Sequence, residues 1–167
     1  MSDSTPRQDR PVLATGGCQC GAVRYALLAA PEVSICHCRM CQKATGGPFA
    51  ALAKVMKTDL VWTRGQPAWF RSSPAAARPF CAACGTPLGF GFDDAPHLEV
   101  TLGSLDQPAR FPPDRQFGVE GRLPWMAALA PGIWPEETTA AAGGPARDRR
   151  SRQHPDHDTP EPWRPEA

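Results

Sequence analysis

Short segments in which apolar and polar residues alternate, separated by glycine and proline, recur along most of this chain. Residues 22–27 alternate as a half-buried strand does, and residues 98–102 repeat the pattern. Residues 49–55 are small and apolar, which is typical of a strand buried on both faces. Only residues 42–45 suggest a helical turn, ended by the glycines that follow. The pattern therefore predicts a mainly β domain.

Four further strands are expected from the same pattern. Residues 60–62 and 68–71 carry aromatic side chains on either side of turn residues, and they predict a hairpin with an aromatic core face. Residues 87–92 alternate large and small side chains, as a strand does against a close neighbour. Residues 116–120 predict a last short strand.

Composition divides the chain into three parts. Residues 1–11 are polar and predict a flexible N-terminal arm, and residues 12–137 hold nearly all the strand patterns. Residues 138–167 are low in complexity, rich in proline and charge, and predict a disordered tail. A length of 167 residues fits one domain with a real core and is short for two.

Charge and hydropathy exclude several classes of partner. A formal net charge of +1 gives no field that would favour nucleic acid or a membrane surface. No apolar run approaches the roughly 18 residues of a transmembrane helix. The polar N-terminus lacks the apolar region of a secretory signal, so we expect a cytoplasmic protein.

The seven cysteines carry the candidate chemistry. An odd number of thiols in a protein expected in the cytoplasm argues against a disulfide framework, and their spacing favours zinc. The cysteines fall into three groups along the chain, namely Cys18 and Cys20, then Cys36, Cys38 and Cys41, then Cys81 and Cys84.

The middle group is the candidate reactive site. Alternate side chains of an extended segment share a face, so Cys36 and Cys38 point the same way and a turn brings Cys41 to the same place. Three thiolates without a fourth ligand nearby in sequence are typical of a zinc site with one open position. His37 is either a fourth ligand or proton carrier, or an inward-facing histidine bonded to a backbone carbonyl.

The outer two groups favour a closed zinc site. Cys81-Ala82-Ala83-Cys84-Gly85 has the form of a zinc knuckle, which supplies half a tetrahedron. Cys18 and Cys20 supply the other half, and such a site contributes folding energy rather than catalysis. In the alternative, the knuckle completes the Cys36 group and leaves Cys18 and Cys20 with only each other. We favour the division into four and three.

Charge compensation at the three-thiol group is a further requirement. Zinc with three thiolates carries a net charge of minus one, and a bound substrate thiolate would make the net charge minus two. Arg39 and Lys43 lie beside the ligands in sequence, and they either compensate this charge, bind the carboxylates of an anionic thiol such as glutathione, or are simply solvated. Asp106 and Glu120 are acid-base candidates only if they lie near the metal.

Five spaced motifs together resemble a known family. The chain is similar to the glutathione-dependent formaldehyde-activating enzyme (GFA) family, whose domain is shared with centromere protein V. The motifs are Gly17-Cys18-Gln19-Cys20-Gly21, the Cys36–Cys41 group, Gly46-Gly47-Pro48-Phe49, residues 80–88 around the knuckle, and Gly103-Ser104-Leu105-Asp106.

The resemblance implies a fold, a metal content and a reaction. The fold is a single small zinc-stabilised β domain similar to methionine sulfoxide reductase B. It implies two zinc ions per chain, a structural one on Cys18, Cys20, Cys81 and Cys84 and a catalytic one on Cys36, Cys38 and Cys41. The family's named reaction joins formaldehyde to glutathione, which makes the expected enzyme a carbon-sulfur lyase acting on a thiol-aldehyde adduct. The alternative from another class is a non-catalytic, zinc-stabilised binding module.

Overall fold

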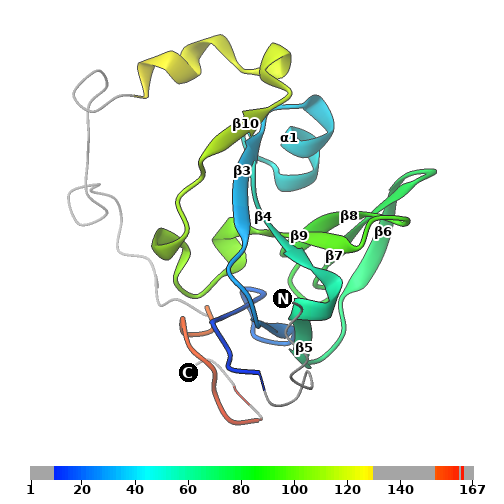
Figure 1. The fold of residues 1–167 in the computed structure, drawn as a ribbon, viewed down its shortest axis with the longest axis vertical. Helices are drawn as coiled ribbons and strands as arrows, with labels where there is room; N and C mark the ends of the chain where they lie inside the picture. Colours follow the sequence, from blue (N-terminus) through cyan, green and yellow to red (C-terminus); the bar gives the residue numbers. More distant parts are fainter. Residues whose placement is uncertain (1–9, 130–152, 162, 164–167) are drawn as a thin grey trace, which may run out of the picture.

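The computed structural model describes residues 10–129, 153–161 and 163 (Figure 1). These residues form strands, one short α-helix and several 3-10 turns, which confirms the mainly β prediction. The strands are β1 (Ala14–Gly17), β2 (Arg24–Leu27), β3 (Glu32–Cys36), β4 (Ala50–Met56), β5 (Leu60–Arg64), β6 (Ala68–Ser73), β7 (Ala76–Phe80), β8 (Gly89–Phe92), β9 (His97–Thr101) and β10 (Arg115–Phe117). The α-helix is α1 (Arg39–Thr45), and the 3-10 turns are Lys57–Asp59, Leu102–Ser104, Pro108–Arg110, Val119–Gly121 and Pro124–Ala128.

The strands form two sheets. The smaller sheet has the order β1-β2-β5, and the larger has the order β10-β3-β4-β9-β8-β7-β6. All the pairs are antiparallel except β10 with β3, which run parallel. In Figure 1, β3 and β4 run side by side, with α1 at one end of them and β6, β7 and β8 to one side.

One hydrophobic core joins the two sheets. Leu27 and Leu60 come from the smaller sheet and Val55 and Val100 from the larger, and all four are buried in the same cluster. Tyr25 lies at its centre with 0% exposure, and its hydroxyl pairs with the Ser104 hydroxyl at 2.7 Å. Burial raises the pKa of Tyr25 well above its ordinary value, so this hydroxyl stays neutral and keeps its hydrogen bond.

The predicted hairpin of residues 60–62 and 68–71 is wrong. β5 pairs with β2 in the smaller sheet, whereas β6 pairs with β7 in the larger. The chain crosses between the sheets at Gly65, which has a φ of +56° and lies so close to the turn before β2 that a Cβ there would be 2.2 Å from the Ala22 carbonyl oxygen. Trp69 and Phe70 are exposed rather than in the core, so the aromatic face predicted for this strand is also wrong.

Part of the predicted disordered tail lies against the domain. The backbone N–H of His154 donates to the carbonyl of Gln19 at 2.7 Å, and Figure 1 shows this segment (red) beside the first strands (blue). The prediction of disorder is therefore wrong for residues 153–161, and residues 138–152 lie outside the described part of the chain. The domain boundaries and the likeness to methionine sulfoxide reductase B stay predictions.

The structure also bears on membrane association. No helix among the described residues combines the length and apolar character that crossing a membrane requires.

Candidate metal centres

Four thiols from two distant segments meet at one point. Each sulfur of Cys18, Cys20, Cys81 and Cys84 lies within 4.8 Å of the others. The Cys18 and Cys20 sulfurs are 3.6 Å apart, and those of Cys20 and Cys81 are 3.9 Å apart. Sulfurs arranged tetrahedrally around zinc, each at about 2.3 Å, would lie about 3.8 Å from one another. The group therefore has the spacing of a closed tetrahedral zinc site, and all seven cysteines are free thiols.

Two glycine turns shape this four-thiol group. After β1, Gly21 adopts a φ of +74° and donates its N–H to the Cys18 carbonyl at 3.0 Å. In the knuckle, Gly85 adopts a φ of +77° and donates to the Cys81 carbonyl at 2.8 Å. A left-handed conformation of this kind costs a residue with a side chain more than it costs glycine. Each pair of thiols is thus held by a tight turn that its sequence encodes locally.

The four-thiol group belongs to the main core. Cys18 and Cys81 are buried among the core residues, and Cys20 and Cys84 pack against them. Burial raises the pKa of Cys18 and Cys81 above the ordinary value. Burial also opposes ionisation of Cys84, but the Thr86 hydroxyl at 3.1 Å and backbone N–H groups outweigh it and lower the pKa of this thiol to about 6. Four thiols in such a place require a cation before all can ionise.

The second group is built from one short segment. Cys36 ends β3, Cys38 caps the N-terminus of α1, and Cys41 lies in its first turn, with the three sulfurs within 4.8 Å of one another. The Cys41 N–H donates to the Cys38 sulfur at 3.4 Å. The described cysteines thus divide into four and three, as favoured from the sequence, and the knuckle does not complete the three-thiol group.

His37 supports the three-thiol segment rather than joining it. Its ring is buried, and Nε2 pairs with Oε1 of Gln116 on β10 at 2.8 Å. Among the described residues His37 is not in the group of candidate ligands, and its Nδ1 has no hydrogen-bond partner. Gln42 also supports the segment, because its side-chain amide donates to the carbonyls of His37 and Gly121 at 2.9 Å each. No described imidazole therefore closes this site.

A buried arginine faces the three-thiol group from the larger sheet. Arg78 on β7 is only 8% exposed, and its guanidinium lies 3.6 Å from the Cys41 sulfur. It also donates to the Ser72 hydroxyl at 3.0 Å and lies over the ring of Phe90, 4.6 Å from its centroid. Burial raises the pKa of Cys41 above its ordinary value, and Arg78, as a fixed cation at this distance, opposes that rise. Arg78 therefore lies where a cation can offset the charge of the thiolates, a role for which the sequence analysis had weighed Arg39 and Lys43.

Arg39 and Lys43 line a neighbouring cavity instead. This cavity of about 510 Å³ lies between α1 and β7, and Arg78 lines it too. Of the described residues that line it, none is acidic. Phe70, Pro79 and Phe80 supply apolar walls. Three cations around one cavity with apolar walls suit an anionic organic molecule.

The three thiols differ in their tendency to ionise. Burial raises the pKa of Cys36 to about 12, with Cys38 and Cys41 adding to the effect. Burial also acts on Cys38, but the N–H donated by Cys41 and contacts with the neighbouring thiols outweigh it and lower the pKa of Cys38. Three thiolates can coexist here only with a bound cation, and a soft divalent ion such as zinc suits this donor set.

The two other acid-base candidates differ in their position. Asp106 accepts hydrogen bonds from Arg24 at 2.8 and 2.5 Å, and no described contact joins it to the three-thiol group. Glu120 is exposed in a 3-10 turn that passes beside Cys38, since a Cβ on Gly121 would lie 3.5 Å from the Cys38 Cα. An acid-base role for Glu120 therefore stays a prediction.

Sequence reasoning missed Arg78, Gln42 and Gln116. An arginine inside the otherwise apolar segment of residues 76–80 was a usable signal, since a charge within a buried strand needs a partner. The two glutamines gave no such signal, because the contacts of Gln116 with His37 and of Gln42 with Gly121 each join residues 79 apart in sequence.

Comparison with known proteins agrees with this arrangement. The family model described as "Glutathione-dependent formaldehyde-activating enzyme" matches residues 13–120, which include all seven cysteines. The chain belongs to this family. A relative in Schizosaccharomyces pombe, named an uncharacterized lyase, is 35% identical over 78 residues, which cover 46% of this chain and 56% of the relative. The match thus spans little more than half of that relative's length.

A solved structure supports the fold of the GFA-family chain. A crystal structure of a Rhodobacter sphaeroides protein superposes with a TM-score of 0.50 at 22% sequence identity. The match covers 61% of this chain and 98% of that one.

Proposed function

We propose that the protein is a zinc-dependent carbon-sulfur lyase that acts on the adduct of a small anionic thiol, such as glutathione, with an aldehyde such as formaldehyde. The observation that carries the proposal is the three-thiol group, which has no fourth described ligand and is faced by the buried Arg78 beside a cationic cavity. The four-thiol group would hold a second, structural zinc ion.

The residues of this chain have separate tasks in this proposal. Cys36, Cys38 and Cys41 would hold zinc, which when bound supplies a positive centre that keeps a substrate sulfur ionised at neutral pH. Arg78 offsets the negative charge of the thiolates from a fixed position. Arg39 and Lys43 bind the carboxylates of the thiol in the cavity and orient its sulfur.

The reaction itself is a simple addition and its reverse. The thiol sulfur attacks the carbonyl carbon, so that a C–S bond forms and the C=O π bond breaks. The carbonyl oxygen takes up the proton that the thiol has given up, and the product is a hydroxymethyl thioether. In the lyase direction the hydroxyl loses its proton, the C=O π bond re-forms, and the C–S bond breaks with its electron pair going to sulfur. The sulfur takes up the proton, and thiol and aldehyde are released.

The test is the rate at which formaldehyde and glutathione interconvert with their adduct, followed by exchange NMR. Wild type should accelerate this exchange, and Arg78→Met should slow it by about tenfold to a hundredfold, since it removes a charge that stabilises the reacting sulfur. Arg71→Met is the matched control, because Arg71 lies on the adjacent β6 but is exposed and pairs with Asp93. It should keep the wild-type rate.

The cavity is tested separately by the choice of thiol. Arg39→Gln and Lys43→Gln should raise KM for glutathione while leaving the exchange with an uncharged thiol, 2-mercaptoethanol, unchanged. No acceleration by fully zinc-loaded wild type with any of several thiols would contradict the proposal. It would favour the binding module, in which both ions are structural.

A further inference from the structure

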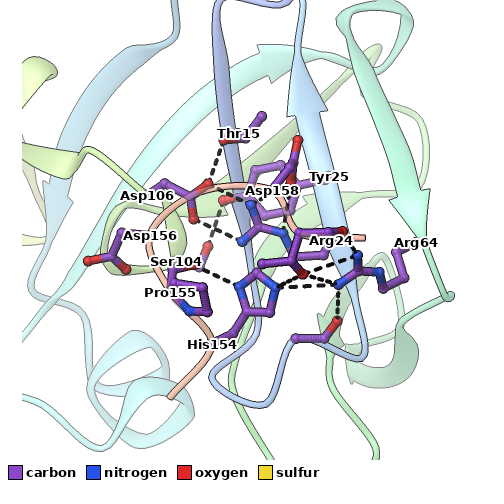
Figure 2. Close-up of polar contacts among 12 residues, drawn as sticks. Thr15, Arg24, Tyr25, Arg64, Ser104, Asp106, His154, Pro155, Asp156 and Asp158 are labelled. Carbon is purple, nitrogen blue, oxygen red and sulfur yellow. Dashed lines mark hydrogen bonds and ion pairs between the residues drawn. The ribbon is translucent and has the colours of Figure 1, made fainter. Parts of the chain in front are cut away.

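A second cluster of charged residues lies on the smaller sheet, away from the three-thiol group. Arg24 on β2 and Arg64 on β5 are paired in register across these two strands. Arg24 is buried, and its guanidinium holds both carboxylate oxygens of Asp106 (Figure 2). The lyase proposal uses none of these residues.

The C-terminal segment, residues 153–161, places two carboxylates on these arginines. Asp158 accepts from Nε and a terminal nitrogen of Arg24 at 3.1 and 2.7 Å (Figure 2). Glu161 accepts from Nε of Arg64 at 2.8 Å. The rest of the Arg64 guanidinium donates to the hydroxyl and carbonyl of Thr159. Each arginine therefore has one carboxylate partner from the segment.

Charge balance favours this docking. The domain side presents two arginines against one carboxylate, and Asp106 is held ionised because Arg24 and Thr15 outweigh burial and lower its pKa. The domain side thus carries an excess of one positive charge. One carboxylate is enough to neutralise this excess, and Asp158 is the one that pairs with the buried arginine.

His154 fixes the position of the segment. Its side chain is buried, with only 3% of the residue exposed, and it lies against Gly21, where a Cβ would come within 2.2 Å of the ring. Nδ1 donates to the Pro155 carbonyl, so Nε2 of the neutral ring accepts from the Thr159 hydroxyl at 2.9 Å and from Arg64 at 3.3 Å. The ring also packs edge-on against Trp163, with centroids 4.8 Å apart.

The docked segment forms one wall of a cavity. This space of about 530 Å³ is lined by Cys18, Cys84 and Arg24 on the domain side and by Gln153, His154 and Asp156 on the other. Access to the four-thiol group from this side therefore depends on where the segment lies.

The ion pairs that hold the segment can be replaced by ion pairs with other carboxylates. The side chains of Asp158 and Glu161 are 55% and 66% exposed, and exposed ion pairs contribute little to stability. The Arg24 side chain, in contrast, is 3% exposed and keeps Asp106 as a permanent partner. Arginine forks of this kind bind any carboxylate of suitable geometry.

We propose that Arg24 and Arg64 form a carboxylate-binding site which the chain fills with its own residues 153–161, and that this segment is a displaceable cover over the cavity beside Cys18 and Cys84. The ligand class of the site is an acidic peptide with two carboxylates three residues apart, as in Asp158-Thr159-Pro160-Glu161. This proposal does not depend on the lyase activity.

Hydrogen exchange on the full chain tests the docking. In wild type the amide of His154, which donates to Gln19, should be protected from exchange. Asp158→Asn should speed its exchange by about tenfold, and Glu161→Gln should have a smaller effect. Asp156→Asn is the matched control, because its carboxylate accepts from Gln153 rather than from an arginine. It should leave the protection unchanged.

Competition tests the site itself. A synthetic peptide of residues 153–163, added to the full-length Asp158→Asn/Glu161→Gln protein, should bind and protect the amides around Gln19, whereas wild type should bind it at least about tenfold more weakly. A peptide with lysine in place of both acids should bind neither protein. Unprotected residues 153–161 in wild type, equal effects of Asp156→Asn and Asp158→Asn, or equal binding of the two peptides would each overturn the proposal.

Discussion

The two thiol groups are made of the same side chain but are built in opposite ways. The four-thiol group joins segments about sixty residues apart and lies within the main core, whereas the three-thiol group comes from one turn and has a small cluster of its own with Ala50 and Leu52. The three-thiol group has a buried cation, Arg78, in direct contact with one of its sulfurs. The number of thiols therefore says less about the role of a metal site than the distance between its ligands along the chain and the charge beside it.

The strongest test of this comparison removes a ligand from the four-thiol group. Cys81→Ser should lower the free energy of unfolding by more than about 4 kcal/mol, because the core loses both a ligand and the cross-link between distant segments. Thermal denaturation followed by circular dichroism, together with zinc content, measures the effect. If Cys81→Ser keeps the wild-type melting temperature, the four-thiol group has no structural role of the kind proposed.

The matching change in the three-thiol group should be far milder. Cys38→Ser should lose one of two zinc ions and the exchange activity, while the free energy of unfolding falls by less than about 1.5 kcal/mol, because Cys38 lies partly exposed at the start of α1. Zinc stoichiometry and melting temperature are measured on the same samples as Cys81→Ser. Equal loss of structure in both variants would abolish the distinction between the two groups.

A smaller change sharpens the comparison without touching a ligand. Gln42→Leu leaves the carbonyls of His37 and Gly121 without their donor, so the three-thiol segment should loosen and its zinc affinity fall by about tenfold to a hundredfold. Competition with a chromogenic chelator measures the affinity of each ion. The control is Thr86→Val, which removes the hydroxyl beside Cys84 and should weaken only the four-thiol ion.

The smallest expected effect is that of pH on the docking of residues 153–161, the segment beside the four-thiol group. Burial lowers the pKa of His154, and Arg24 and Arg64 add to this while Asp106 opposes it. A lowered folded-state pKa means that docking of residues 153–161 is fully stabilised above the ordinary value of about 6.5 and is weakened as the pH falls through that value towards the folded one. The protection factor of the His154 amide, which is the intrinsic exchange rate at each pH divided by the observed rate, should therefore fall below about pH 6.5. His154→Gln should remove this dependence, and a protection factor in wild type that does not change with pH would contradict the prediction.

The features that the sequence predicted correctly depend on neighbours along the chain. Strand β4 followed from the small apolar run at 49–55, and the turn of α1 followed from the glycines after Thr45, because both are local patterns. The pairing of the knuckle with Cys18 and Cys20 could also be inferred, since each pair supplies half of a tetrahedral site.

The features that were missed depend on partners far away in sequence. β5 and β6 flank a turn that suits a hairpin, yet β5 finds a better place beside β2, where Leu60 lies opposite Leu27 in the core. Asp158 was assigned to a disordered tail because its composition is that of a solvated segment, and nothing local shows that Arg24, 134 residues earlier, presents it with a buried cation.

The separation of ligands along the chain also sets an order for synthesis. During synthesis, all three cysteines of the three-thiol group have left the ribosome once residue 41 has emerged. The four-thiol group still lacks Cys81 and Cys84 until residue 84 has emerged. During that interval Cys18 and Cys20 lack their two partner ligands, whereas the three-thiol group is complete. In the proposed two-zinc protein, the three-thiol group can therefore bind its ion before the four-thiol site is complete.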